Sequence, residues 1–300
     1  MFSEDNILST ADLPIGAVII GSAIFILTII GLIIDIKFFV MRHLLRSNFL
    51  SYADEVRERP LYGRDAARSL LLIVLLFLSL HFLQDKLNVK KFYCSDYWQW
   101  SLFIINTLSL PFIVMISTAS LLYSRKLSAQ NMFGIALQPL SVVFRKSLLF
   151  LLGLIPIILA ANILFLMFLD SIGYPIAPQE IVTVFMSQDI PLWQQIYLAI
   201  AAIIVAPIAE EILFRGICLP AAMKHMPVKD AVILVSVFFA FVHQHPESAP
   251  SLFILAAVFS IAYLHTGNLL VPIFMHSIFN ASQIITILSI KDVPGIMPGN

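Results

Sequence analysis

Residues 196–216 read IYLAIAAIIVAPIAEEILFRG, an apolar run that ends in two adjacent glutamates and an arginine. The run from Ile196 to Ala209 has the composition of a segment buried in a membrane. A charged side chain at the centre of a membrane helix costs roughly 2.5 to 3.5 kcal/mol on insertion scales. Glu210, Glu211 and Arg215 therefore need a compensating role, which makes them the first candidates for a functional site.

The composition of the whole chain is typical of a membrane protein. Hydrophobic residues make up 60% of the 300 residues and charged residues 12%, with a mean hydropathy of +0.94. One soluble core cannot hide that much apolar surface, so the sequence predicts an all-α, polytopic transmembrane helical bundle. The zero net charge gives no basic field for nucleic acid. Cys94 and Cys218 are too few and too far apart for a disulfide framework or a metal knuckle.

About eight apolar segments approach the roughly 20 residues that cross a hydrocarbon layer of about 30 Å. They are expected near 15–36, 69–84, 100–123, 147–169, 192–209, 230–243, 251–265 and 268–290. The sixth and seventh are short, so the sequence leaves seven or eight spans open. Gly173 and three prolines within 170–191 separate a half at 1–190 from a half at 191–300. Polar residues inside the spans of the first half are interpreted as helix-packing groups: Asp35, His81, Asn106 and Asn162.

The distribution of lysine and arginine predicts the orientation of the chain. The segments 37–68, 124–146 and 210–229 carry fourteen of these residues, whereas the opposite side carries four. Under the positive-inside rule the amino terminus is expected outside. The segment 210–229 is expected to be a cytoplasmic loop with the glutamates at its membrane edge, so that the site opens toward the cytoplasm.

Two stretches supply polar residues at helical spacing besides Glu211 and Arg215, which share a helix face. Glu210 points about 100° away from Glu211 around the helix, so it does not share in the ion pair with Arg215. A carboxylate without a partner in a dry site is suited to act as a general base. His243 ends an apolar stretch one turn after Phe239, and His276 and Asn280 lie one turn apart within another. Two alternatives stay open: a helix end with solvated charges at 210–215, and ordinary packing for His276 and Asn280.

At these positions the sequence resembles the CPBP family of intramembrane proteases, which includes the type II CAAX prenyl endopeptidases and bacterial homologues linked to bacteriocin self-immunity. That family is marked by EExxxR, FxxxH and HxxxN/D on successive helices. All three occur here in order, as Glu210-Glu211-x-x-x-Arg215, Phe239-x-x-x-His243 and His276-x-x-x-Asn280. The resemblance covers roughly 192–290 and implies that 191–300 is the protease domain, whereas 1–190 has no recognised motif.

The resemblance implies a role for each matched residue. Glu210 and His243 would activate a water molecule, and His276 and Asn280 would stabilise the oxyanion that the attack creates. Glu211 and Arg215 would orient Glu210 and hold the helix end, with Phe239 as a supporting residue. The expected partners are membrane lipid and a peptide or prenylated protein substrate, and no nucleic acid.

Cofactor chemistry and function class are left open by the sequence. No obligatory cofactor is expected, but a divalent metal such as zinc is an alternative, with ligands among Glu210, Glu211, His243 and His276. His245 follows the FxxxH motif, but Pro246 places it in a loop and ranks it below His243. Cys218 is interpreted as a small packed residue rather than a nucleophile. The competing function is a membrane transporter or scaffold that binds an ion or peptide with the same cluster.

Overall fold

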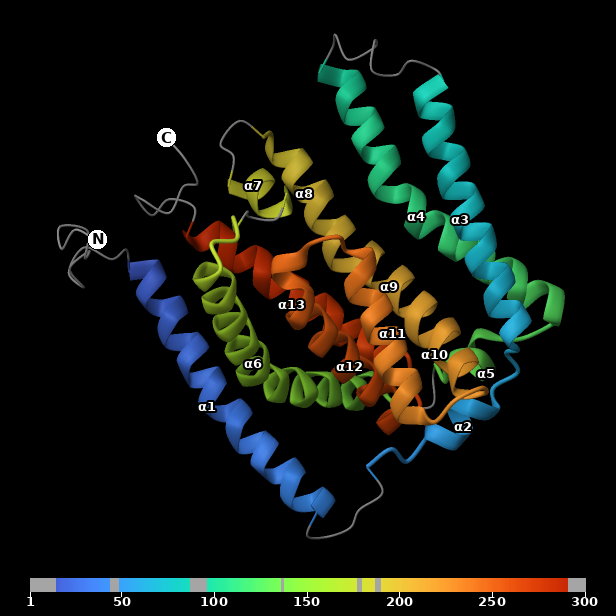
Figure 1. Ribbon diagram of the computed structural model, residues 1–300, viewed down its shortest axis with the longest axis horizontal. Helices are drawn as coiled ribbons and strands as arrows, with labels where there is room; N and C mark the ends of the chain where they lie inside the picture. The colour runs from blue at the N-terminus through green and yellow to red at the C-terminus, as the bar shows by residue number, and fades with distance from the viewer. Residues whose placement is uncertain are drawn as a thin grey trace.

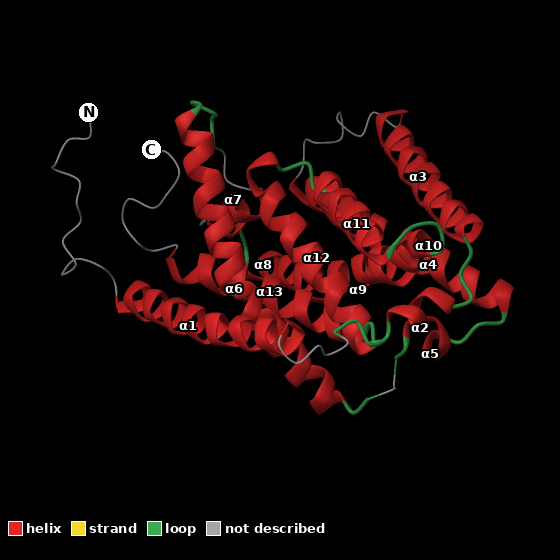
Figure 2. Ribbon diagram, turned by 60° about the horizontal axis from the view of Figure 1, so that its bottom comes forward, coloured by secondary structure: helices red, strands yellow, loops and turns green. Residues whose placement is uncertain are grey.

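The computed structural model describes residues 15–43, 49–86, 96–135, 138–176, 180–186 and 190–290. All regular structure in these residues is helical, as Figure 2 shows, and they contain no strand. Six helical stretches of the described residues are long and apolar enough to cross a membrane: 21–39, 107–125, 140–171, 192–223, 246–266 and 270–290. The predicted class, an all-α polytopic membrane bundle, is confirmed.

Each of the eight predicted segments falls on a helix of the structure. The helices are α1 (Ile15–His43), α3 (Gly63–Lys86), α4 (Asp96–Arg125), α6 (Leu140–Ser171), a rod that begins with α8 (Leu192–Ile200), α11 (Val228–Val242), α12 (Ala249–Thr266) and α13 (Leu270–Ile290). Shorter helices lie between them: α2 (Ala53–Glu58), α5 (Ala129–Phe133), α7 (Glu180–Met186) and the 3₁₀ turn η5 (Pro246–Ser248). Helices α3 and α11 are not among the six stretches, and α11 has only 15 residues.

The fifth span is a continuous rod, so the predicted loop at 210–229 is wrong. After α8 the rod continues through the π-helical turn η3 (Ala201–Val205), α9 (Ala206–Glu211), the π-helical turn η4 (Ile212–Cys218) and α10 (Leu219–Met223). Glu211 and Arg215 form an ion pair within the rod, at 2.9 Å between Oε1 and Nη1, with 0% of either side chain exposed. Because the two charges neutralise each other, the helix continues through them, and the alternative of a solvated helix end is excluded for this pair.

Helices of the two halves of the chain pack against each other in one bundle (Figure 1). Helix α6 lies along α1 and also packs against α12 and α13, while α4, paired with α3, packs against α9. Ser251 on α12 donates a hydrogen bond to Asn162 on α6, which confirms the packing role of Asn162. Asp35 on α1 lies against α6 at Gly153. The side chains of His81 and Asn106 lie outside the described residues, and the division at 190/191 stays a prediction.

Four connecting segments meet at one face of the bundle, around the side chain of Arg59. Its guanidinium donates to the carbonyl oxygens of Met132 and Gly267 and to the hydroxyl of Tyr263. Its own carbonyl oxygen accepts a hydrogen bond from Lys224 Nζ at 2.8 Å. The segments before α3, around α5, after α10 and between α12 and α13 are thereby tied together. We call this the Arg59 face; the opposite face carries the turn at 243–248 between α11 and α12.

Burial of Arg59 lowers its pKa to about 10, although Glu55 acts in the opposite direction. The side chain is therefore still positively charged at neutral pH. A buried cation needs several acceptors, and the three oxygens around its guanidinium supply them. Arg59 thus joins the first half of the chain to the turn that precedes α13.

The contact between α1 and α6 depends on Gly31. A Cβ atom at this position would lie 2.3 Å from the carbonyl oxygen of Leu152 and 2.7 Å from Cδ of Pro156. Gly31→Ala should therefore lower the free energy of unfolding by about 1 to 3 kcal/mol, the usual cost of overpacking. The check is the thermal unfolding midpoint of the purified protein in detergent.

The matched control is Gly21→Ala in the same helix, where a Cβ would meet nothing within 4 Å. That change should be neutral or stabilising, because alanine forms helix better than glycine by about 1 kcal/mol. Equal midpoints for the two variants would contradict a close contact at Gly31.

Candidate functional site

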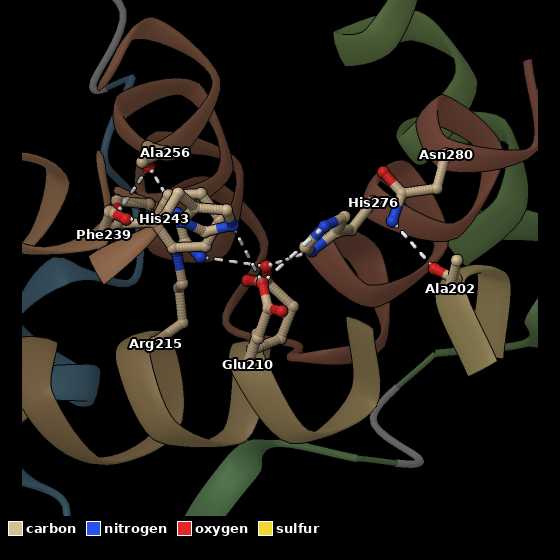
Figure 3. Close-up of polar contacts among 10 residues, drawn as sticks. Ala202, Glu210, Arg215, Phe239, His243, Ala256, His276 and Asn280 are labelled. Carbon is tan, nitrogen blue, oxygen red and sulfur yellow. Dashed lines mark hydrogen bonds and ion pairs between the residues drawn. The ribbon is translucent and has the colours of Figure 1, made fainter. Parts of the chain in front are cut away.

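Five charged or polar side chains from three separate stretches of the sequence meet inside the bundle. Glu210 and Glu211 come from α9, Arg215 from η4, His243 from the end of α11 and His276 from α13 (Figure 3). Most positions of the three sequence motifs therefore lie in one place. Asn280 is held by a different contact, described below.

The inner part of this cluster is a buried, hydrogen-bonded set. Oε1 of Glu211 lies 2.9 Å from Nη1 of Arg215 and 2.9 Å from Nδ1 of His276. Because a carboxylate only accepts, Nδ1 of His276 carries the proton. Nη2 of Arg215 donates to the carbonyl oxygen of Ala256 at 2.9 Å. Glu211 therefore fixes the ring orientation of His276, whereas the sequence had assigned it to orienting Glu210.

Aromatic rings enclose the guanidinium of Arg215. Its central carbon lies 4.8 Å from the ring centroid of Phe239, 5.4 Å from Phe259 and 5.9 Å from Phe214. A cation against aromatic faces gains most when water is excluded, as here. Phe239 was predicted as a supporting residue. Phe259 and Ala256 were missed because α12 carries no polar pattern, and only its packing brings them to the site.

The outer part of the cluster is centred on Oε2 of Glu210. This atom lies 3.9 Å from Nε2 of His243 and 3.9 Å from Nε2 of His276. Nδ1 of His243 is 2.7 Å from the carbonyl oxygen of Phe239, which only accepts, so Nδ1 carries the proton there. In the neutral ring Nε2 of His243 is then an acceptor that faces the acceptor of Glu210. A separation of 3.9 Å is too long for a direct hydrogen bond and suits a bridging molecule.

Solvent exposure divides the cluster in the same way. The exposed fraction is 26% for the side chain of Glu210 and 30% for that of His243, but 5% for that of His276. Oε2 of Glu210 is itself buried and has no hydrogen-bond partner among the described residues. A buried acceptor without a partner is costly, and in a cleft it is typical of a group that binds a ligand or a reacting molecule.

Asn280 lies one turn beyond His276 on α13 and donates from Nδ2 to the carbonyl oxygen of Ala202 at 2.8 Å (Figure 3). This contact ties α13 to η3. The amide keeps a second N–H proton. A neutral His276 has its only N–H proton on Nδ1, facing Glu211, so its Nε2 can donate only when the ring is protonated. Stabilisation of the oxyanion by His276 and Asn280 therefore stays a prediction, and for His276 it requires the protonated ring.

Two residues that the sequence ranked lower lie outside the cluster. Nδ1 of His245 is 3.4 Å from Oε2 of Glu247 in the turn after α11. Cys218 is a buried free cysteine whose side chain packs in the main hydrophobic core. The interpretation of Cys218 as a packing residue agrees with this position.

The residues named as alternative metal ligands do not fit zinc in this arrangement. Two ligands of a tetrahedral zinc ion with bonds of about 2.1 Å lie about 3.4 Å apart. Glu210 is 3.9 Å from each histidine nitrogen, and Glu211 is engaged by Arg215 and His276. Among the described residues, no group of three or more His, Cys, Asp or Glu side chains has the geometry to hold a metal ion.

The fold and the cluster together define a class: a multi-pass membrane protein with a polar site of glutamate, histidine and arginine between its helices. Residues 192–282, about a third of the chain, match the family model described as Rce1-like, type II CAAX prenyl endopeptidase Rce1-like. This segment is therefore similar to the CAAX prenyl endopeptidases, as its three motifs predicted. Neither a comparison with curated proteins nor one with solved structures found a match. The family match supports an intramembrane endopeptidase as the general class of this protein.

Proposed function

We propose that this protein hydrolyses a peptide bond within the membrane, using a water molecule activated by Glu210 and His243. The observation that carries the proposal is the approach of two proton acceptors, Oε2 of Glu210 and Nε2 of His243, across 3.9 Å. A water molecule between them donates one hydrogen to each, which directs an oxygen lone pair toward a carbonyl carbon. The partial exposure of both side chains supports access for that water.

In the proposed reaction, the water oxygen bonds to the carbonyl carbon while one of its protons passes to Glu210. The carbonyl oxygen becomes negative in the tetrahedral intermediate. Protonated His276 and the second amide proton of Asn280 are the proposed donors to this oxygen. Glu210 then transfers its proton to the amide nitrogen, and the carbon–nitrogen bond breaks to give an amine and a carboxylic acid.

The family match makes a prenylated CAAX peptide the first substrate to test. We expect the purified protein to cleave such a peptide after the prenylated cysteine and to release the terminal tripeptide, detected by mass spectrometry. The same peptide without its prenyl group tests the lipid requirement. A set of unrelated peptides tests for a peptide-processing or self-immunity role instead.

Two controls make this experiment decisive. Glu210→Gln should cleave none of the peptides, which excludes a contaminating protease. A chelator should leave the rate unchanged, because the proposed reaction needs no metal, and a loss of activity that zinc restores would overturn that part. If every peptide stayed intact, the cluster would serve a transporter or scaffold instead.

For orientation in the membrane, we propose that the Arg59 face lies in the cytoplasm and the amino terminus outside. Thirteen lysines and arginines lie in the sequence segments 37–68, 124–146 and 224–229, and each of these segments has a described residue at the Arg59 face: Arg59 itself, Met132 and Lys224. Four lie elsewhere outside the rod: Lys86, Lys90, Lys91 and Lys291. This asymmetry supports the proposal under the positive-inside rule.

A further inference from the structure

The rod that carries the two glutamates is not a regular α-helix, because a wide turn lies just before them. In η3 the backbone N–H of Ala206 donates to the carbonyl oxygen of Ala201, five residues back, whereas the spacing in an α-helix is four. Such π-turns are rare, and single turns of this kind within α-helices are frequent at functional sites. The turn directly precedes α9, on which Glu210 and Glu211 lie.

Pro207 explains why the wide turn forms at this point. Its backbone nitrogen carries no N–H, and in a regular turn its ring would collide with the carbonyl oxygen of Ile203, four residues back. A turn with one extra residue changes the position of that carbonyl group. The rod therefore continues through the proline into α9 without a break.

The wide turn leaves one carbonyl oxygen without a main-chain donor, and Asn280 supplies the missing donor. Four residues after Ala202, the N–H of Ala206 is engaged at Ala201, and five residues after it stands Pro207, which has no N–H. Within the described rod, neither position can donate to the carbonyl oxygen of Ala202. Nδ2 of Asn280 donates to it at 2.8 Å (Figure 3). A carbonyl group without a partner is costly in a membrane, so this bond stabilises the wide turn.

The part of the rod before η3 is held in place by other contacts. The hydroxyl of Tyr197 on α8 donates to the carbonyl oxygen of Ile104 on α4 at 3.3 Å. Leu198 packs in a small core with Phe185 of α7 and Ile284 of α13. A change in the shape of η3 is therefore expected to turn α9 and to leave α8 where it is.

The extra residue in η3 decides which side chain of α9 faces the histidines. Successive residues of an α-helix are about 100° apart, so one residue more or less before α9 turns it by that angle. If η3 closed into a regular turn, Ala209 would take the present direction of Glu210, and Glu210 that of Glu211. Oε2 of Glu210 would then no longer lie 3.9 Å from Nε2 of both His243 and His276.

The contacts of α13 with the rod depend on the same turn. Asn280 binds the carbonyl oxygen of Ala202, and His276, one turn earlier, binds Oε1 of Glu211 at 2.9 Å. In a regular α-helix the nine steps from 202 to 211 amount to about 180°, which would place the two positions on opposite faces. With one extra residue taken up in η3 the angle falls to about 80°, so both positions can face α13.

We propose that Pro207 is a positioning residue for the proposed reaction: it imposes the wide turn η3, and this turn directs Glu210 toward His243 and His276. Asn280 contributes by stabilising the turn. The proposal rests on the proposed function for the role of Glu210, whereas the rotation of α9 is a property of the fold. Pro207 acts through the direction of Glu210 and not on the substrate.

The first test measures the rotation of α9 without activity, by the reaction of single cysteines with methyl methanethiosulfonate in detergent. The side chain of Glu210 is 26% exposed, whereas Ala209 is 3% exposed. In a Cys94→Ser background, Glu210→Cys should react at least about fivefold faster than Ala209→Cys, because exposure governs access to a thiol. Adding Pro207→Ala should reverse this order, since alanine supplies an N–H and permits a regular turn. An unchanged order would overturn the proposal.

The second test separates positioning from folding. Pro207→Ala should lower kcat for peptide cleavage by about 10- to 100-fold, as a misplaced catalytic group does, with KM changed less than about threefold. Its thermal unfolding midpoint should not fall, because alanine is a better helix former than proline. An unchanged kcat, or a loss of kcat that comes with a lower midpoint, would overturn the positioning role.

The matched control for the kinetics is Pro111→Ala. Pro111 lies inside α4, which is α-helical over its whole length and packs against α9. The same chemical change there should leave kcat at the value of the unmodified protein. Failure of the proposed function would appear as no cleavage by the unmodified protein, with the reversed labelling still observed. Failure of the positioning role would appear as full cleavage and unchanged labelling in Pro207→Ala.

Discussion

Glu210→Gln should lower kcat/KM for peptide cleavage by about 10³-fold or more, within the range that general acid–base groups contribute. Glutamine keeps the shape of the side chain but cannot accept a proton from water at this position. Oε2 of Glu210 has no hydrogen-bond partner among the described residues, so little of the fold depends on its charge. The measurement is the cleavage rate of purified variant and unmodified protein at equal concentrations.

The matched control for this change is Glu247→Gln. Glu247 lies in the turn after α11, near His245 and outside the cluster. The same chemical change there should alter the cleavage rate less than fivefold. Size-exclusion profiles in detergent should be identical for both variants. Equal loss of activity in the two would show that Glu210 has no special role.

Arg215→Ala should have the largest effect on stability, lowering the free energy of unfolding by about 3 to 5 kcal/mol. The change leaves the carboxylate of Glu211 buried and uncompensated, with only His276 as a partner. It also removes the cation that three aromatic rings enclose. Unfolding by heat or denaturant in detergent, followed by circular dichroism, measures the loss.

A double variant separates loss of charge balance from loss of packing. Arg215→Met with Glu211→Gln removes both charges and keeps most of the volume, so it should be more stable than Arg215→Ala alone. Lys229→Ala, an exposed cation, should change stability by less than about 0.5 kcal/mol. If Arg215→Ala were as stable as Lys229→Ala, the ion pair would not support the fold.

The sequence predicted the spans well because membrane helices need long apolar runs, and each of the eight predicted segments is helical. It failed at the end of the fifth span because charge was taken as a sign of solvent. The residues Glu211 and Arg215 are adjacent on one helix face, and a pair that neutralises itself lets the helix continue to Met223. A hydropathy profile alone does not show that Glu211 and Arg215 form an ion pair.

The candidate site was predictable where its residues repeat at helical spacing, as Glu211 and Arg215 or Phe239 and His243 do. Sequence spacing within one helix says nothing of contacts between helices. The hydrogen bonds from His276 to Glu211 and from Asn280 to Ala202 are contacts between helices. Arg59 was missed for the same reason, since the partners of its guanidinium lie in two distant segments, at Met132 and at 263–267.

The central claim is that Glu210 and His243 act on one water molecule, and a double-mutant cycle tests it most directly. Single-turnover cleavage is compared for Glu210→Gln, His243→Asn and the double variant. Residues that act as a unit show strongly non-additive losses, so the double variant should be no slower than the slower single variant. Losses that multiply, or full cleavage in either single variant, would contradict a shared hydrolytic centre.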